Sequence, residues 1–531
     1  NVGIAANGGH SSAQGTQHNA SQLQAGKNIQ VNAQQINDAA TQYQATGDVV
    51  LNSQEHKLNA VINNETSNEM KAGANLNVSA STKDFNSATL TVGVGASYQQ
   101  GNNHSEKAQS GKIQADNIRI STDKLHSQSD LQASGDIDIN ARQGAVLNTA
   151  DNRQSQRGGG FNASAEVGAF VVPAAGTAVP SINVNVSANG QNSNKVDANH
   201  QHIDGKNVHI QSEGNVQLTG TQVNAAENLT LAGNNIRVDG AQSHADNVAV
   251  NVGAGVAIGA NVSNLGINGN LKVETGNSLT HENAQLNGKN VKVQANQGID
   301  LNAVSSKADN LTLDAGNGNL NLQAEANKVN KTNVDLGLNL SGKIADQQWQ
   351  PAAGSAHLKV ENVRNETHNA TTLTAENAQI NANGNANYIG STIQADKVSG
   401  NIGGNSLSQG LNDNINETSV NLSASGSGKL TLPIADKWQE SAKNDWNNGT
   451  IAGVKADAAV DVSVKKETRP VNAGVQSAND HSKVQGQKQH IAASSTKRKN
   501  AEFHARVTTQ LKKRVTNDNK PIVLLDKNFG K

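Results

Sequence analysis

Residues 290–322 decide the fold and read NVKVQANQGIDLNAVSSKADNLTLDAGNGNLNL. Within them, Val291-Lys292-Val293 is followed by Leu311-Thr312-Leu313, one repeat of about 20 residues further along the chain. A second pair, Ile299-Asp300-Leu301 and Leu320-Asn321-Leu322, lies between and after them. Each triplet places a polar residue between two apolar ones, which predicts a short strand with one buried and one solvated face. Three residues make too short a strand to be stable alone, so neighbouring strands must stabilise each one.

The same arrangement recurs along the chain. Leu271-Lys272-Val273 precedes Val291 by the same interval, and Val208, Leu229 and Val248 continue the series at closely similar intervals. Gly, Asn or Asp precedes most of these strands, and Gly and Asn readily adopt the positive φ of a sharp corner. A turn of about 20 residues can coil and stack on the next turn, so that parallel strands bury one continuous narrow core.

The pattern therefore predicts an all-β chain, a right-handed parallel β-helix of about 14–18 coils at a strand spacing of about 4.8 Å. The alternative, an array of small antiparallel sheets, needs longer strands and hairpin turns about every 8–12 residues. Stacked Asn side chains at the coil corners are expected to hydrogen-bond along the stack.

The composition agrees with a narrow core. Aromatic residues make up 2% of the 531 residues, and the chain has 50 Gly and no Cys. Disorder is excluded because the apolar residues fall in short alternating runs. The net charge of -1 gives no global attraction to nucleic acid or to an anionic membrane. No run approaches the roughly 18 apolar residues of a transmembrane helix, and a chain that begins at Asn1 is predicted to be a piece of a longer protein.

Several alternating runs are too long for one coil edge. We predict that they leave the coil as β-hairpin arms along its flank, where an arm can pair with a neighbouring edge. Two arms, Thr332 to Trp349 and Thr418 to Trp438, share a longer pattern, and Gly158-Gly159-Gly160 is interpreted as a hinge before an arm. The predicted arm segments are 88–98, 181–186, 252–262, 333–340, 419–423 and 458–464.

One stretch carries a family resemblance. Asn215 to Ala225, followed by Asn228 to Val238, resembles the haemagglutinin repeats of filamentous haemagglutinin-like exoproteins, including contact-dependent growth inhibition effectors. The resemblance covers roughly residues 20–470. It implies two-partner secretion through an outer-membrane transporter and a secreted protein on the bacterial cell surface. No cofactor is predicted. The implied partner is a receptor on a host or neighbouring cell, either a glycan or a protein.

Three functions remain open from the sequence. The leading one is a rigid shaft for adhesion and target-cell binding, and the second is the delivery region of a contact-dependent growth inhibition toxin. The third is a polysaccharide lyase or hydrolase on a β-helix scaffold, which needs clustered acids and bases. Asp136 and Asp138 share one strand face, but they are interpreted as outward positions of a half-buried strand. His200 and His202 have no repeated ligand spacing, so no metal site is predicted, and the chain is predicted not to be an enzyme.

Three Trp residues are the candidate receptor contacts. Trp349, Trp438 and Trp446 follow predicted arms, where a narrow coil core has little room for an indole. A Trp on a surface loop is a good anchor for a sugar or a protein. The alternative is that each Trp caps the exposed base of its arm.

The C-terminal segment has a different composition. From Asp480 to Lys531 there are 12 Lys or Arg and 4 Asp or Glu. Within Ser495 to Val515, apolar residues recur every four positions, which predicts a basic, partly helical segment. We therefore expect a β-helix shaft with arms over residues 1–470. Residues 471–531 are expected to be a linker, or the start of a toxin or pretoxin module.

Overall fold

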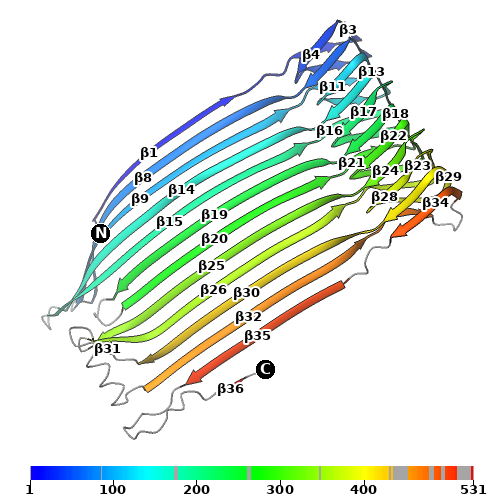
Figure 1. Cartoon of the computed structure of the whole chain (residues 1–531). Helices are drawn as coiled ribbons and strands as arrows, with labels where there is room; N and C mark the ends of the chain where they lie inside the picture. Colours follow the sequence, from blue (N-terminus) through cyan, green and yellow to red (C-terminus); the bar gives the residue numbers. More distant parts are fainter. Residues whose placement is uncertain are drawn as a thin grey trace.

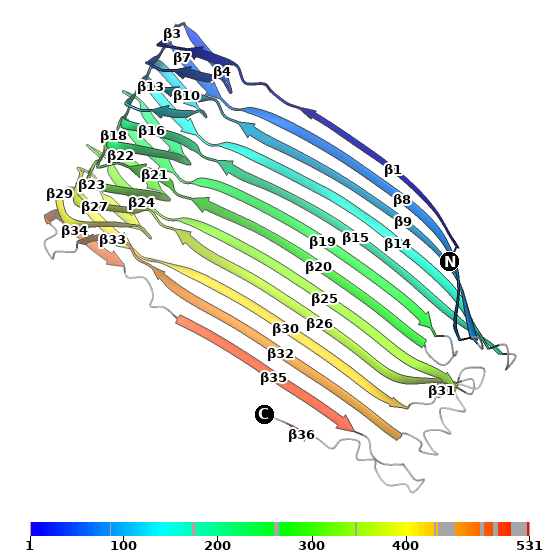
Figure 2. The same ribbon diagram turned by 180° about the vertical axis from the view of Figure 1, so that it is seen from behind.

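A computed structural model describes residues 2–84, 87–172, 177–259, 265–345, 348–429, 432–433, 452–477, 483–491, 497–510 and 528–529. All elements in this part of the chain are β-strands, arranged in two sheets (Figures 1 and 2). One sheet is parallel and coils into a stack. The other is antiparallel and extends sideways from that stack.

The parallel sheet is a β-helix, as predicted. Its strands are β2 (Gln22–Ala25), β3 (Ile29–Asn32), β4 (Gln35–Ala39), β5 (Gln42–Ala45), β6 (Val49–Asn52), β7 (Glu55–Asn59), β10 (Lys112–Ala115), β11 (Ile118–Ser127), β12 (Asp130–Ala133), β13 (Asp136–Asn148), β16 (Gln201–Gln211), β17 (Asn215–Thr219), β18 (Thr221–Asp239), β21 (Ala284–Asn287), β22 (Asn290–Asn302), β23 (Val304–Asp314), β24 (Asn319–Gln323), β27 (Thr372–Ala382), β28 (Ala386–Ile389), β29 (Thr392–Gln409), β33 (Gly474–Ser477) and β34 (Lys483–Ile491).

The described residues form eleven coils. Their first strands are β2, β5, β10, β12, β16, β18, β21, β23, β27, β29 and β33. This number is lower than the 14–18 predicted because the arms take up far more of the chain than the alternating runs indicated.

One buried column shows how the coils stack. Each residue pairs in parallel with its counterpart in the next coil, and each is at most 9% exposed. The sequence pattern thus identified the inward positions Val208, Leu229, Val291 and Leu311 correctly. The column comprises Ile29, Val49, Ile118, Ile137, Val208, Leu229, Val291, Leu311, Ala378 and Val398.

Asn side chains form the predicted ladder beside this column. Asn290 donates its side-chain amide to Asn228 Oδ1 at 2.8 Å, and Asn310 donates in turn to Asn290 Oδ1 at 2.8 Å. The ladder continues to Asn377 at one end and, through Asn207, to Asp136 at the other. The side-chain amides and one carboxylate therefore form a continuous row of hydrogen bonds along six coils on the outer surface.

Two segments assigned to the coil belong elsewhere. Leu271-Lys272-Val273 lies in β20 (Leu265–Glu282), which pairs antiparallel with β19 (Ala241–Ile258) and with β25 (Glu325–Ala345). Val248 lies in β19 and is 44% exposed. The assignment was wrong because an apolar-polar-apolar triplet has the same period of two in both sheets. The interval between Leu271 and Val291 therefore matches the coil repeat only by coincidence.

The antiparallel sheet contains the predicted arms. Its twelve long strands, called here the lateral sheet, are β1 (Val2–Thr16), β8 (Val61–Asp84), β9 (Ser87–Gln109), β14 (Ala150–Val172), β15 (Thr177–Asn199), β19, β20, β25, β26 (Gln348–Asn369), β30 (Leu411–Lys429), β32 (Ala452–Val471) and β35 (Lys497–Gln510). The short strands β31 (Leu432–Pro433) and β36 (Asn528–Phe529) pair with β26 and β35. The predicted arm segments lie in this sheet, except that Gly259 follows the end of β19 and residues 260–262 are outside the described residues.

A hairpin leaves the β-helix after every second coil. The arms begin at Val61, Ala150, Ala241, Glu325 and Leu411, at nearly regular intervals. Each hairpin pairs along its length with the hairpins before and after it, so the arms join into one sheet (Figure 1). The structural repeat is therefore one arm plus two coils.

Two further predictions were wrong. Gly158-Gly159-Gly160 is not a hinge, because it lies within β14 and pairs with β9 and β15 on both sides. Residues 497–510 are not helical, because they form β35 and pair antiparallel with β32 from Lys497 to Gln510. The unpaired backbone groups of β32 provide a template that outweighs a weak helical spacing. The strand candidate that begins at Pro521 lies outside the described residues.

Deleting one arm is expected to leave the β-helix folded. We suggest replacing residues 153–196 with Asn-Gly, because Asn152 and Asp197 are cross-strand partners that a two-residue turn can join. On the coil, β13 still pairs directly with β16 and β17. The far-ultraviolet circular dichroism melt should keep one cooperative transition, and its loss would show that the arm is part of the coil core.

Candidate binding surface

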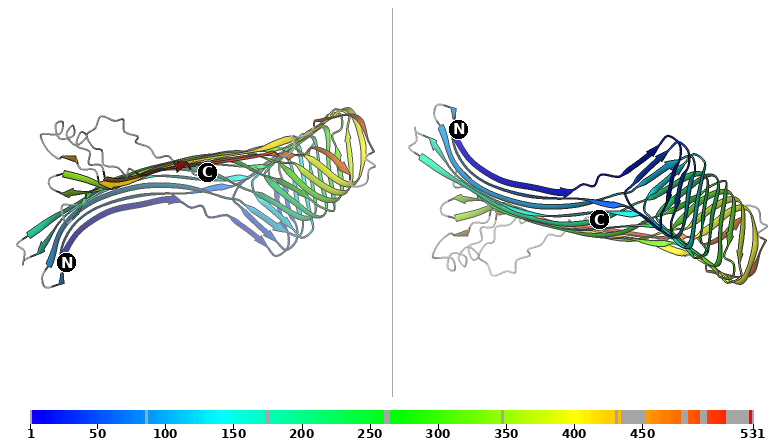
Figure 3. Two further views of the ribbon diagram at one scale, coloured as in Figure 1. Left: turned by 90° about the horizontal axis from the view of Figure 1, so that it is seen from below. Right: turned by 90° about the horizontal axis from the view of Figure 1, so that it is seen from above.

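The lateral sheet is the candidate functional surface because it presents side chains far from the coil core. Figure 3 shows it as a single layer that extends from the stack of coils. The long strands of each hairpin extend away from the coils. The strand ends that lie farthest from the coils form a row along one edge of the molecule (Figure 1). Polar contacts link neighbouring strands near the base, for example between Thr66 Oγ1 and His104 Nδ1 at 2.8 Å.

One face of the distal half of the lateral sheet is apolar. Directly paired residues on adjacent antiparallel strands point to the same face. The register therefore places apolar residues side by side across the sheet. We call this surface the apolar face and define it by three rows: Leu76, Val94, Ala165, Val184, Val256, Ile267 and Leu340; Ala72, Tyr98, Phe161, Ala188, Val252, Leu271, Leu336, Leu358, Leu422 and Val460; and Val250, Val273, Val334, Val360, Val420, Val462 and Phe503.

These side chains are half-buried or exposed in the single chain. Val94 is 52% exposed, Phe161 50% and Phe503 59%, whereas the coil valines such as Val293 are fully buried. Tyr98 and Phe161 are stacked on neighbouring strands, with ring centroids 6.0 Å apart and an interplanar angle of 24°. An aromatic pair thus lies in a mostly aliphatic surface.

The opposite face is polar and rich in Asn and Gly. One cross-strand row reads Asn75, Gly95, Ser164, Asn185, Gly255, Asn268 and Asn339. A Cβ atom at Gly255 would collide with the side-chain oxygens of Asn185 and Asn268. Glycine is required at position 255 because the side-chain amides of Asn185 and Asn268, on the two neighbouring strands, occupy the space that a Cβ atom would need.

The structure places the three candidate Trp residues only in part. The backbone of Trp349 lies in β26 opposite Ile344, near the distal end of its hairpin, and also pairs with Leu432. Trp438 and Trp446 lie outside the described residues, between β31 and β32 along the chain. Their role as receptor contacts stays a prediction.

The acidic pair has the location that was predicted. Asp136 and Asp138 are exposed, and they alternate with the buried Ile137 and Ile139 along β13. Asp136 accepts the ladder bond from Asn207 at 2.7 Å, and Asp138 lies 3.9 Å from the Arg119 guanidinium. Both carboxylates therefore have structural partners on the coil surface.

The two histidines also have separate contacts. His200 bridges the bases of neighbouring arms: Nδ1 lies 2.8 Å from the Gly220 carbonyl and Nε2 lies 2.7 Å from Glu282. The backbone N–H of His202 donates to Asp130 at 2.9 Å, while burial raises the pKa of that carboxyl. Within the described ranges, no group of three or more His, Cys, Asp or Glu could hold a metal ion.

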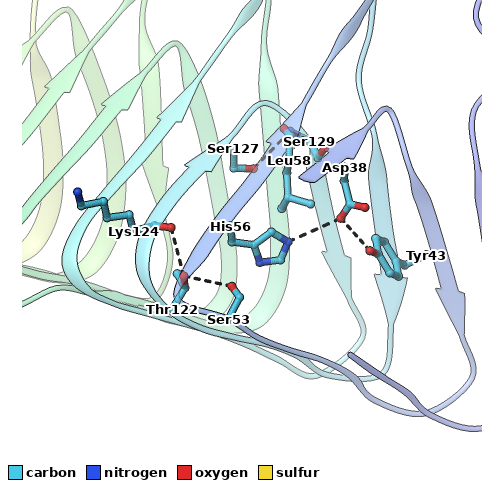
Figure 4. A network of polar contacts seen from close by, with 9 residues as sticks. All are labelled: Asp38, Tyr43, Ser53, His56, Leu58, Thr122, Lys124, Ser127 and Ser129. Atoms are coloured by element: carbon cyan, nitrogen blue, oxygen red, sulfur yellow. Dashed lines mark hydrogen bonds and ion pairs between the residues drawn. The ribbon is translucent and has the colours of Figure 1, made fainter. Parts of the chain in front are cut away.

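A buried polar cluster in the first coils was not predicted. The Tyr43 hydroxyl donates to Asp38 at 2.7 Å, and His56 Nε2 lies 3.7 Å from the same carboxylate (Figure 4). His56 is fully buried, and neither ring nitrogen has a hydrogen-bond partner. Burial and the Asp38 contact raise the pKa of Tyr43. The alternation around His56 marks it as inward-facing, but the Asp38 carboxylate near its ring lies in the preceding coil.

The fold and the surface define a class of protein: a β-helical repeat protein with a hairpin after every second coil. Comparison with known proteins agrees with this class. The hemagglutinin repeat family matches residues 2–124, 92–225, 182–295 and 274–424. The chain therefore belongs to the hemagglutinin repeat family and is a filamentous haemagglutinin-like protein, as its resemblance implied.

One curated relative is a protein named Hemolysin from Serratia marcescens. It is 26% identical over 476 residues, which cover 80% of this chain and 29% of the relative. The chain thus spans less than a third of that protein. No solved structure matches the chain. In the part of the chain that is described, no helix is long and apolar enough to cross a membrane.

Proposed function

We propose that this chain is the shaft of a secreted, non-enzymatic exoprotein on the bacterial cell surface, where it acts in adhesion and target-cell binding. The observation that carries the proposal is the row of hairpin ends, which are all displayed on the same side of a continuous coil stack (Figure 1). A rigid scaffold that presents a row of strand ends is well suited to binding, because the scaffold loses little conformational entropy.

Family membership supports the route to the surface. Filamentous haemagglutinin-like proteins use two-partner secretion, so the proposed export partner is an outer-membrane transporter. The second partner is a surface receptor, either a glycan or a protein. Trp349, Trp438 and Trp446 are the proposed contacts, since an indole offers a large apolar area and one hydrogen-bond donor.

The test is binding of the fluorescently labelled chain to cells, measured by flow cytometry. Replacing Trp349, Trp438 and Trp446 together with Ala should reduce binding at least tenfold. The matched control is Lys292→Ala on the exposed coil surface, which should bind like the parent. Equal binding by the triple variant would remove the Trp residues from the proposal, and no binding by the parent would contradict the adhesive function.

Delivery of a toxin into a target cell is the second candidate function. It is favoured by the basic composition of the chain after Asp480. The coding sequence after Lys531 discriminates between the two functions. A toxin module there, followed by a small immunity gene, would support delivery. Polysaccharide and nucleic-acid turnover assays on the purified chain are expected to show no activity.

A further inference from the structure

The apolar face is uncovered across the width of the lateral sheet. The hydrophobic core cluster of the described residues is confined to the coils, and the lateral sheet is a single layer (Figure 3). Val94, Val184 and Val256 of the apolar face are each at least 38% exposed, although they lie in the middle strands of the sheet. A soluble monomer rarely exposes a contiguous apolar patch of more than a few hundred Å².

The size of the apolar face can be estimated from strand geometry. The three rows cross on average about eight strands about 4.8 Å apart and together span about eight residues at about 3.4 Å each, which gives roughly 1,000 Å². A stable protein–protein interface needs about 800 Å² from each partner. The apolar face therefore exceeds what a stable dimer requires.

We propose that a second copy of this chain covers the apolar face, so that two lateral sheets pack face to face in a dimer. Such packing is physically favourable for sheets: two layers lie about 10 Å apart with strand directions within about 30°. The same surface serves both partners in a two-fold dimer, so it must be self-complementary. Val, Leu and Ala at regular pleat spacing meet this condition.

Charge and aromatic content favour a copy over a lipid surface. The three rows of the apolar face contain no Lys, Arg, Asp or Glu, so two identical faces do not repel each other. A peripheral membrane surface uses basic residues and interfacial aromatics as anchors. Here the aromatic residues are only Tyr98, Phe161 and Phe503. The charged residues, such as Lys272 and Asp335, lie on the opposite face, which would stay in water.

Sedimentation velocity of the full chain tests this proposal. The parent should sediment as a dimer in the micromolar range. A Val94→Asp, Val256→Asp variant should be monomeric, or show a dissociation constant at least tenfold higher. Both positions are already exposed in the single chain, so the variant should fold, with an unchanged circular dichroism spectrum. The control is Asn75→Asp, Asn268→Asp in the adjacent row of the polar face, which should remain dimeric.

A spin label gives a second readout, because the chain contains no Cys. A label at Val184→Cys should be immobilised in the dimer and become mobile in the Asp variant. A label at Asn185→Cys, on the adjacent position of the polar face, should be mobile in both. A monomeric parent, or a dimer that the Asp substitutions leave intact, would overturn the proposal. The proposal would also be overturned by a monomeric chain whose label at position 184 becomes immobilised when phosphatidylglycerol vesicles are added, because the apolar face would then bind lipid. These outcomes do not depend on whether the chain binds cells.

Discussion

Replacing Val293 with Asp should destabilise the coil stack by several kcal/mol. Val293 is fully buried and pairs in parallel with Leu231 and Leu313, above and below it. A carboxylate at this position would be surrounded by aliphatic side chains, and a buried unpaired charge is among the most costly substitutions known. Urea unfolding followed by circular dichroism should show a markedly lower midpoint.

The neighbouring residue provides a matched control. Lys292 is exposed on the same strand, so Lys292→Asp introduces the same side chain into water. Its effect should stay within about 0.5 kcal/mol, as is typical of surface substitutions. If both variants unfolded at the same midpoint as the parent, the inward register of β22 would be wrong.

Tyr388→Ala should cost about 3–5 kcal/mol, the range for removing a large buried aromatic side chain. Tyr388 is the largest fully buried side chain among the described residues, and its strand partner Leu322 is in the preceding coil. The substitution would leave a cavity between coils that already hold few large side chains. Denaturant unfolding measures the loss.

Tyr388→Phe separates the ring from the hydroxyl. The Tyr388 hydroxyl has no hydrogen-bond partner, and burial raises its pKa. Removing an unsatisfied buried hydroxyl should leave stability unchanged or raise it by about 1 kcal/mol. A large loss in the Phe variant would show that the hydroxyl forms a hydrogen bond, contrary to the structure.

The duplication seen in the sequence has a structural meaning. Thr332 and Thr418 begin the two matching patterns, and their separation equals that of Glu325 and Leu411, where two successive arms begin. The separation between Thr332 and Thr418 is therefore the length of one arm plus two coils, whereas the repeat of about 20 residues is the length of a single coil. The two periods coexist because a hairpin that leaves and returns at the same corner does not change the register of the coils it interrupts.

The sequence by itself determined the local structure of the coils. Val291, Val293, Leu311 and Leu313 point inward, because alternation over three residues admits only one buried face. The Asn ladder also followed, since identical residues recur at the corner of each coil. The arms were recognisable because their alternating runs exceed the length of a coil edge.

Only the tertiary structure decided which strand pairs with which. Leu271-Lys272-Val273 and Val291-Lys292-Val293 are nearly the same triplet, yet one lies in the lateral sheet and the other in the coil. Residues 497–510 form a strand because their backbone pairs with the edge of β32. The apolar face likewise depends on the register of eleven strands. Strand pairing is a contact between residues far apart in the chain, so a local pattern specifies the face of a strand but not its neighbour.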